Sequence, residues 1–371
     1  MNTNHQNNFL LIGAVLILAT TAQAQIFFPG AKECAKLRDL VSRHERVAQL
    51  SKPVIRGASE ALDDAPQPLK HIIYEGRLDT DPQRIATVAS LLDMQKIDLL
   101  IQAGIATGET RYAKKTREYV LAWTAAYEPT GNPINEVKLL PLLVAYEWQR
   151  NAFSPVDQKR IDSWMKTLAL VEMQSAKTRP QSTHNNWHPK RLELVAAIGK
   201  ILSEETYVRY AVDGAKSYVA ASLRPDGSSV DFEQRDALSY HIGGIKPLLR
   251  LAALLKSSGF DLYSYTAPNG ASVKKSVNFV APFAKGEITH GEFARTTADL
   301  DKKRAAAGIP HYQPGRLFEP ASSLSLFEMA TAFEPSYAAL VARLASSSDE
   351  VYPTWNVAMV RAGWLCAAPD L

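Results

Sequence analysis

Several side chains that can bind an anion are concentrated in the stretch Gln181–Pro189. They are two histidines, two asparagines and a tryptophan: His184, Asn185, Asn186, Trp187 and His188. Pro189 suits the first turn of a helix, so we expect a helix to open there, with the Asn and His side chains just ahead of it. Free backbone N–H groups at a helix N-terminus favour an anion, and the amides and imidazoles beside them can neutralise a carboxylate. The alternative is that these side chains only cap the helix.

A second group of reactive side chains lies at Asp231–His241, where a leucine-rich segment begins that is predicted to be helical over residues 235–257. Asp236 and Tyr240 have the spacing that places two side chains on one helix face. Arg235 can reach the same pocket if the helix begins near it. A phenol titrates near pH 10 and becomes a base only when positive charge stabilises its anion. A tyrosine on a helix is otherwise usually a core or rim residue.

Together these two groups resemble the alginate lyase superfamily, particularly polysaccharide lyase family 5 and its divergent relatives that act on mannuronate or glucuronan. That family pairs an Asn-Asn-His motif with a later Arg and an Ala-Tyr-His motif. The counterparts here are Asn185-Asn186-Trp187-His188, Arg235 and Ser239-Tyr240-His241, with similar upstream segments at Tyr74-Glu75-Gly76, Tyr112-Ala113-Lys114-Lys115, Ala122-Trp123 and Trp148. Trp187 follows the Asn pair directly, so either Trp187 or His188 takes the family's histidine position. Glu233 stands where the family has its arginine, which leaves Arg235 as the candidate.

The resemblance implies cleavage of a β-1,4-linked polyuronate by syn β-elimination, which gives a 4,5-unsaturated uronic acid end. Asn186 and His188, supported by Asn185, would neutralise the uronate carboxylate and so stabilise the enolate-like transition state. Tyr240 would remove the C5 proton and protonate the C4 oxygen, because the two lie on the same face of mannuronate and glucuronate. Arg235, together with a histidine when that side chain is protonated, would supply the positive charge that the phenolate needs. The resemblance implies no metal and no organic cofactor.

A cleft for an acidic polysaccharide should be both aromatic and basic. The candidate substrate-binding residues are Trp123, Trp187, Tyr127, Lys138, Arg84 and Lys190, together with His184, Asn185 and His241 beside the two motifs. Each of these types of residue is also common in purely structural positions.

Two other functions fit the same sequence. A glycoside hydrolase on a similar helical toroid needs two carboxylic residues across a cleft, and Asp231, Glu233 and Asp236 are available, although all three lie on one segment. The other alternative is a non-catalytic polysaccharide-binding protein. Detection of an unsaturated product distinguishes a lyase from both.

The composition and charge of the chain agree with an enzyme that acts on an anion. The 371 residues are 46% hydrophobic and 22% charged, which excludes a wholly disordered protein. The formal net charge of +4 is too small for a typical nucleic-acid-binding protein, but it favours an anionic substrate. We expect an acidic polysaccharide partner, no nucleic acid, and a monomer.

The N-terminal segment has the pattern of an export signal. An apolar run, Phe9–Thr21, is followed by Ala22-Gln23-Ala24, which resembles a signal-peptidase site. We therefore predict that residues 1–24 are a signal peptide and that the mature protein is periplasmic or secreted, with no membrane attachment after cleavage. An uncleaved anchor and a buried helix are the alternatives. Cys34 and Cys366 lie near the two ends of the mature chain, and either a disulfide or two free thiols is compatible with export.

Helical spacing of apolar residues dominates the remaining sequence and predicts an all-α fold. Predicted helices cover residues 34–50, 82–106, 112–127, 134–152, 155–176, 190–201, 204–223, 235–257, 320–332 and 335–346. Short turns between them favour antiparallel helical hairpins. Because heptads and fixed-length repeats are absent from the sequence, we predict an (α/α) toroid or incomplete barrel that forms one domain over residues 25–371. The clearest strand signal is Tyr352–Val360.

Two stretches, residues 51–82 and 284–316, look irregular. The second contains a charged run, Asp299–Arg304, and then Pro310-His311-Tyr312. Long irregular loops in compact domains are often functional, although a solvated surface loop is the alternative for each.

Overall fold

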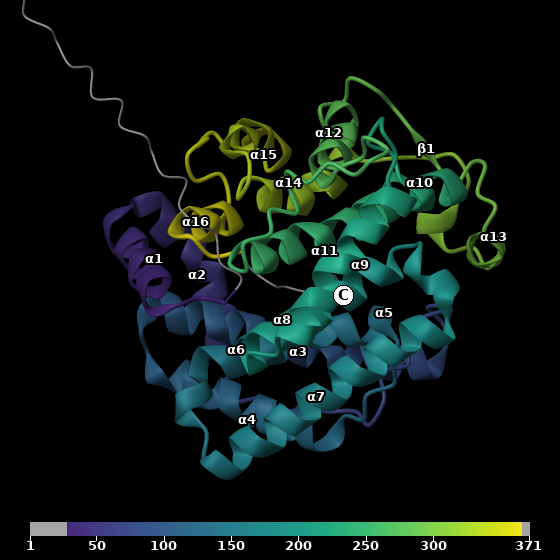
Figure 1. Cartoon of the computed structure of the whole chain (residues 1–371). Coiled ribbons are helices and arrows are strands. Elements are labelled where there is room, and N and C mark those ends of the chain that lie inside the picture. The colour runs from purple at the N-terminus through teal and green to yellow at the C-terminus, as the bar shows by residue number, and fades with distance from the viewer. Residues whose placement is uncertain (1–27, 366–371) are drawn as a thin grey trace, which may run out of the picture.

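The computed structural model describes residues 28–365, which fold almost entirely into helices (Figure 1). The longer helices are α1 (Ala31–Arg43), α2 (Glu45–Glu60), α3 (Pro82–Thr107), α4 (Thr110–Ala126), α6 (Leu140–Gln149), α7 (Pro155–Thr178), α8 (Trp187–Leu202), α9 (Glu205–Ser222), α11 (Leu238–Lys256) and α12 (Val273–Ala284). The shorter ones are α5 (Pro133–Glu136), α10 (Val230–Arg235), α13 (Asp299–Ala306), α14 (Leu324–Ala330), α15 (Ala338–Leu344) and α16 (Trp355–Ala362). The predicted signal peptide lies outside the described residues.

Short 3-10 helices and one small sheet connect these elements. The 3-10 helices are η1 (Val137–Leu139), η2 (Arg150–Ala152), η3 (Pro180–Thr183), η4 (Pro310–Tyr312), η5 (Pro320–Ser323) and η6 (Pro335–Tyr337). Strands β1 (Gly291–Glu292) and β2 (Arg316–Leu317) pair antiparallel, with Gly291 opposite Leu317 and Glu292 opposite Arg316.

The helices form a ring whose inner members contact one another in sequence. Helix α2 packs on α3, α3 on α6, α6 on α8, α8 on α11, α11 on α14 and α14 on α16. Helix α16 then packs on α1 and α2, so the yellow C-terminal helix lies beside the purple N-terminal pair in Figure 1. Helices α4, α7, α9 and α12 pack against the outside of this circuit. The predicted all-α toroid of helical hairpins is confirmed.

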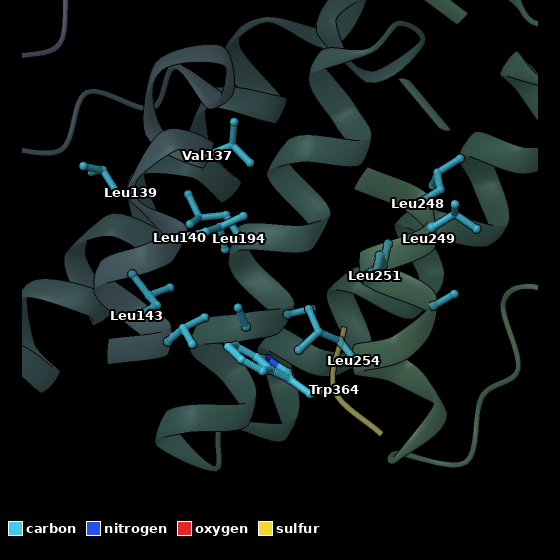
Figure 2. Packing of buried hydrophobic residues seen from close by; sticks show 14 of the residues in the cluster. Val137, Leu139, Leu140, Leu143, Leu194, Leu248, Leu249, Leu251, Leu254 and Trp364 are labelled. Atoms are coloured by element: carbon cyan, nitrogen blue, oxygen red, sulfur yellow. The ribbon is translucent and has the colours of Figure 1, made fainter. Parts of the chain in front are cut away.

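The middle of the ring is filled with apolar side chains. Helices α6, α8 and α11 are buried on almost every face, as expected for an inner layer that is covered on all sides. Figure 2 shows part of this cluster, with Trp364 at its lower edge and these side chains of η1, α6, α8 and α11: Val137, Leu139, Leu140, Leu143, Leu194, Leu248, Leu249, Leu251 and Leu254. Trp364 is 1% exposed and comes from the segment that follows α16.

Two buried ion pairs link α8 to its neighbours. Arg191 on α8 contacts Glu172 on α7 at 3.2 Å, and both side chains are 0% exposed. Glu193, also on α8, accepts two hydrogen bonds from the guanidinium of Arg250 on α11. A buried charge without a partner is costly, so these pairs fix the positions of α7 and α11 along α8.

The predicted strand at Tyr352–Val360 is wrong, because most of that segment forms α16. The hydroxyl of Thr354 accepts a hydrogen bond from the backbone N–H of Val357 and so caps the helix. Gly363 ends it in the left-handed conformation, with φ of 100°. Burial of α16 against α1 and α14 gives it partners that local sequence does not reveal.

The irregular stretches also contain more helix than predicted. Helix α2 continues through Pro53 to Glu60, and the part of residues 51–82 that is not helical is shorter than expected. Helix α12 was not predicted, and neither was α13, which contains the charged run of residues 299–304. The long helices α3, α7 and α9 agree with their predicted ranges to within a few residues.

Within residues 28–365, none of the helices combines the length and the apolar character needed to cross a membrane. Cys34 is buried, which raises the pKa of its thiol, and its Sγ lies 3.8 Å from the carbonyl oxygen of Pro29. Cys366 lies outside the described residues, so a disulfide between the two cysteines stays a prediction.

Replacing Trp364 with Ala tests the role of this residue in the apolar core. Truncating a buried Trp removes its packing and leaves a cavity, so the free energy of unfolding should fall by about 3–5 kcal/mol. Urea unfolding followed by circular dichroism measures the change. The control is Val156→Ala, because Val156 is 78% exposed and its truncation should change stability by less than about 0.5 kcal/mol. Equal effects of the two changes would contradict a core role for Trp364.

Candidate active site

A pocket of about 390 Å³ lies between the N-terminal end of α8 and the first half of α11. The loop between α2 and α3, the η1 segment and the α13–η4 segment form its other sides. The lining residues are Tyr74, Glu75, Gly76, Arg84, Ile134, Val137, Lys138, Asn186, Trp187, Lys190, Arg235, Ser239, Tyr240, Gly243, Pro247, Arg250, Leu300, Arg304, His311 and Tyr312. Both motifs found in the sequence contribute to it, so the fold brings together the two segments that carry the resemblance.

Positive charge dominates the pocket. Its basic lining residues are Arg84, Lys138, Lys190, Arg235, Arg250 and Arg304, whereas Glu75 is the one acidic residue in the described lining. Such a cavity attracts a polyanion and raises its local concentration. The basic candidates Arg84, Lys138 and Lys190 all line this pocket, and their role in substrate binding stays a prediction.

Tyr74 forms part of the pocket wall between two of these cations. The guanidinium carbon of Arg84 lies 3.9 Å from the centre of its ring, and Nζ of Lys138 lies 4.1 Å from that centre. Arg84 also donates to the carbonyl oxygen of Tyr74 at 3.0 Å. These contacts hold the aromatic ring in place beside the cavity.

At the start of α8, Asn186 is the N-cap residue, but its side chain makes no capping hydrogen bond. The structure therefore does not support the alternative that the Asn186 side chain serves only as a helix cap. The neighbouring Asn185 behaves differently, because its Oδ1 accepts a hydrogen bond from the backbone N–H of Trp187 at 3.0 Å. Lys190 donates from Nζ to the carbonyl oxygen of Gly243 on α11 at 2.9 Å, which ties the two motif-bearing helices together.

His188 does not lie in the pocket lining, contrary to the prediction. The ring is 6% exposed, packs near Tyr218 on α9, and accepts a hydrogen bond at Nδ1 from Arg191 at 3.3 Å. Burial, followed by the positive charge of Arg191, lowers its pKa to about 3. The physical reason is that α8 begins at Trp187 rather than at Pro189, so His188 is already part of the helix and points toward α9. Trp187 faces the cavity instead.

Behind Asn186 lies a buried carboxyl group, Asp231. Its side chain accepts a hydrogen bond from the backbone N–H of Asn186, and its Oδ2 has no partner. Burial raises its pKa to about 6, although the charges of Lys190 and Arg235 oppose this. Asp231 is thus close to the pocket wall without being part of it.

Tyr240 is the centre of a compact charged cluster. Its hydroxyl oxygen accepts from Nη1 of Arg304 at 3.1 Å and from Nη1 of Arg235 at 3.4 Å, and the hydroxyl donates to Oδ1 of Asp301 at 3.4 Å. Arg235 stacks over the Tyr240 ring at 4.3 Å and pairs with Asp301 at 2.6 Å. Burial is the main cause that raises the pKa of Tyr240, the hydroxyl of Tyr312 adds to it, and the two arginines oppose it. The resting side chain is therefore a neutral phenol.

Asp236 and Tyr240 do not share a helix face, because α10 ends at Arg235 and α11 begins at Leu238. Asp236 lies between them with φ of 50°. Its carboxylate accepts from the backbone N–H of Arg295 at 2.8 Å and from the guanidinium of the same residue at 3.2 Å. Asp236 therefore anchors the segment that leads into α13, and it is not part of the pocket.

Several other predicted binding residues lie elsewhere. Trp123 is fully buried and donates a hydrogen bond from Nε1 to the carboxylate of Asp93 at 2.9 Å. Tyr127 is also buried, and its hydroxyl donates a hydrogen bond to the carboxylate of Glu136. His241 is 0% exposed, and its ring nitrogens contact Ser229 and the carbonyl oxygen of Ser276. Their environments are those of core residues. His184 is exposed and, like Asn185, is absent from the described lining.

Sequence reasoning missed the residues that α13 and η4 bring to Tyr240. Asp301, Arg304, His311 and Tyr312 come from the stretch 284–316, which the sequence marked only as an irregular, charged candidate loop. The charged run and the Pro-His-Tyr segment were the available signals. Arg250 was also missed, because it lies inside a leucine-rich helix. Among residues 28–365, no group of three or more His, Cys, Asp or Glu side chains is arranged to hold a metal ion.

The fold is similar to that of known alginate lyases. An alginate lyase from Bacteroides ovatus superimposes with a TM-score of 0.66 at 17% identity, over 91% of this chain and 99% of that one. An alginate lyase from a Sphingomonas species gives 0.60 at 18% identity, over 85% and 91%. A histidine-to-alanine variant of an alginate lyase, complexed with a tetrasaccharide, gives a TM-score of 0.54 at 18% identity, over 72% of this chain and 80% of that one.

No curated protein matches the sequence. The family model described as alginate lyase, however, matches residues 41–290, which include both motifs and the helices α3 to α12 that position them. With this match over most of its length, the chain belongs to the alginate lyase family.

Proposed function

We propose that this protein is a polysaccharide lyase that cleaves a β-1,4-linked polyuronate, either mannuronate-rich alginate or glucuronan, by syn β-elimination. The observation that carries the proposal is a tyrosine hydroxyl bonded by two guanidinium groups, inside a cationic pocket that also contains Asn186. Family membership supports lyase activity on alginate. Mannuronate and glucuronate differ only at C2, so both polymers are candidate substrates. The proposed location of the enzyme is the periplasm or the cell exterior.

The first requirement of elimination is neutralisation of the uronate carboxylate, because the C5 proton is a poor acid while that group keeps its full charge. Asn186 has an uncommitted side chain at a helix N-terminus, and Lys190 lies one turn further along the same helix. Donors held in place before the reaction stabilise the developing enolate without reorganisation. We assign this role to Asn186 with Lys190, and not to His188, which is buried outside the pocket.

The second requirement is a base for the C5 proton and an acid for the C4 oxygen. Tyr240 can serve as both, because one hydroxyl can exchange a proton with two groups on the same face of the sugar. The phenolate takes the C5 proton, the C–H electrons form the C4–C5 double bond, and the C4–O bond breaks. The departing oxygen then takes the proton from Tyr240, which returns to the phenolate, so protons and electrons balance.

The carboxyl groups of the site give little support to a glycoside hydrolase. That chemistry uses two carboxylic residues on opposite sides of the sugar. Of the three candidates in the sequence, Asp231 is buried behind Asn186, Glu233 pairs with Arg224, and Asp236 pairs with Arg295. None of them belongs to the described lining, in which Glu75 is the one acid.

The central test uses purified protein with polymannuronate, glucuronan and a panel of other polyuronates. The wild type should release unsaturated oligosaccharides, seen as a rise in ultraviolet absorbance, and Tyr240→Phe should lower the rate by at least about a thousandfold, because the base is lost. Tyr352→Phe, outside the pocket, is the control and should keep wild-type activity. If no polyuronate yields unsaturated product, the protein is not a lyase.

The two adjacent asparagines provide a matched comparison. Asn186→Ala removes a proposed carboxylate donor, so kcat/KM should fall by about a hundredfold, mainly through kcat. Asn185→Ala removes only a hydrogen bond to the backbone of Trp187 and should cost less than about tenfold. Steady-state kinetics of both variants on the preferred polymer measures the difference. A larger loss in Asn185→Ala would reverse the assignment of the two residues.

The pH dependence follows from the direction of the Tyr240 shift. Its pKa is raised above the ordinary value, so the phenolate is scarce at neutral pH and its fraction grows as pH rises. We expect kcat/KM to increase by about tenfold per pH unit between about pH 6 and pH 9. His188 and His241, with pKa values lowered to about 3 and about 4, stay neutral over this range. A flat profile with intact folding would contradict a phenolate base.

A further inference from the structure

We propose that Arg304 on α13 is a catalytic arginine that holds the Tyr240 oxygen as the reactive anion, whereas Arg235 shares its charge with Asp301. The inference rests on the proposed elimination, since it assigns a residue to the same reaction. It changes the assignment made from the sequence, in which Arg235 and, when protonated, a histidine supplied positive charge to the phenol.

The contacts of Arg235 show why its charge is less available. Its Nη1 lies 2.6 Å from Oδ1 of Asp301 but 3.4 Å from the hydroxyl oxygen of Tyr240. The Asp301 side chain is 0% exposed, so solvent does little to screen this attraction. Asp301 also accepts from the Tyr240 hydroxyl, and its negative charge opposes formation of a phenolate. Asp301 therefore offsets part of the positive charge that Arg235 presents to Tyr240, although Arg235 still lowers the pKa of this phenol.

Arg304 has the opposite arrangement. Its Nη1 donates to the hydroxyl oxygens of Tyr240 at 3.1 Å and of Tyr312 at 2.9 Å. Among residues 28–365, no carboxylate forms an ion pair with Arg304. Its guanidinium carbon also lies 4.7 Å from the centre of the Tyr312 ring, which restrains the side chain. The charge of Arg304 is thus directed at the reacting oxygen and is not compensated by an acid.

The segment that carries Arg304 is fixed to the start of the helix that carries Tyr240. Glu292 on β1 accepts from the backbone N–H groups of Leu238 and Ser239, at 2.6 and 3.4 Å. The Phe293 backbone N–H donates to the carbonyl oxygen of Asp236 at 2.7 Å, and Thr296 donates from its hydroxyl to Asp301 at 3.0 Å. These bonds place α13 beside the first turn of α11, so the distance from Arg304 to Tyr240 is set before substrate arrives.

Within the proposed elimination, Arg304 acts at both proton transfers. A guanidinium donor 3.1 Å from the phenol oxygen stabilises the anion more than the neutral phenol. It therefore favours the phenolate that takes the C5 proton. It also stabilises the phenolate that is restored when the same proton passes to the departing C4 oxygen. Arg304 itself keeps its protons throughout.

The test compares Arg304→Ala with Lys303→Ala, which removes a charge from the neighbouring, exposed position of α13. Arg304→Ala should lower kcat by about a hundredfold, the loss seen when one donor to a reacting oxygen is removed, with little change in KM. Lys303→Ala should stay within about threefold of the wild type. Arg304→Lys should recover part of the rate, because it keeps the positive charge but loses the planar donor group.

Two further readouts separate catalysis from structural support. Added guanidinium at millimolar, non-denaturing concentration should partly restore kcat in Arg304→Ala but not in Tyr240→Phe. Thermal unfolding of the Ala and Lys variants at position 304 should match the wild type. The proposal is overturned if Arg304→Ala keeps wild-type kcat, or if its loss is confined to KM. A wild type that cleaves no polyuronate would instead refute the proposed function, so the two failures are distinguishable.

Discussion

The packing of α8 against α11 determines the geometry of the whole candidate site, since one helix carries Asn186, Trp187 and Lys190 and the other carries Tyr240. Two contacts fix this packing. The buried Glu193–Arg250 pair joins the helices in the core, and Lys190 reaches the carbonyl oxygen of Gly243 near the pocket. Any shift of one helix along the other would separate the carboxylate donors from the base.

Charged side chains are found in two kinds of environment in this protein, the core of the ring and the wall of the pocket. Inside the ring, Arg191 and Arg250 are matched by glutamates, because an unpaired ion there would be costly. Around the pocket, Arg84 and Arg235 are paired with aspartates outside the lining, whereas Arg304 forms no ion pair with an acid among the described residues and faces the hydroxyl of Tyr240. Asp301 shares features of both environments, because it is buried like a core residue but contacts Arg235 and Tyr240, the groups proposed to take part in the reaction. The same helix, α13, thus contributes both a compensated and an uncompensated charge.

Much of the architecture was predictable because long amphipathic or fully apolar helices leave a clear periodicity. The all-α toroid and the pocket positions of Asn186, Arg235 and Tyr240 followed from that pattern and from the family resemblance.

The predictions that failed concern residues whose positions depend on contacts with segments distant in the sequence. Helix α13 has few apolar residues and its shape depends on bonds from Thr296 and the β1 segment, so its sequence resembles a solvated loop. His188 was misplaced because α8 begins at Trp187, whereas the presence of Pro189 suggested a later start. Trp123 and His241 are polar-tipped side chains whose partners lie on other helices, which local sequence cannot reveal.

Because α16 closes the ring, the N-terminal helices cannot complete their packing before the C-terminal segment is present. Arg46 on α2 bonds the hydroxyl of Ser347 and the carbonyl oxygens of Tyr352 and Pro353, more than three hundred positions later in the chain. Helices α1 and α2 are synthesised first but must wait for these partners, and the central apolar layer stays accessible until Trp364 enters it. Contacts between such distant segments slow folding. A growing chain of this kind therefore remains open and incompletely packed until its last helices emerge.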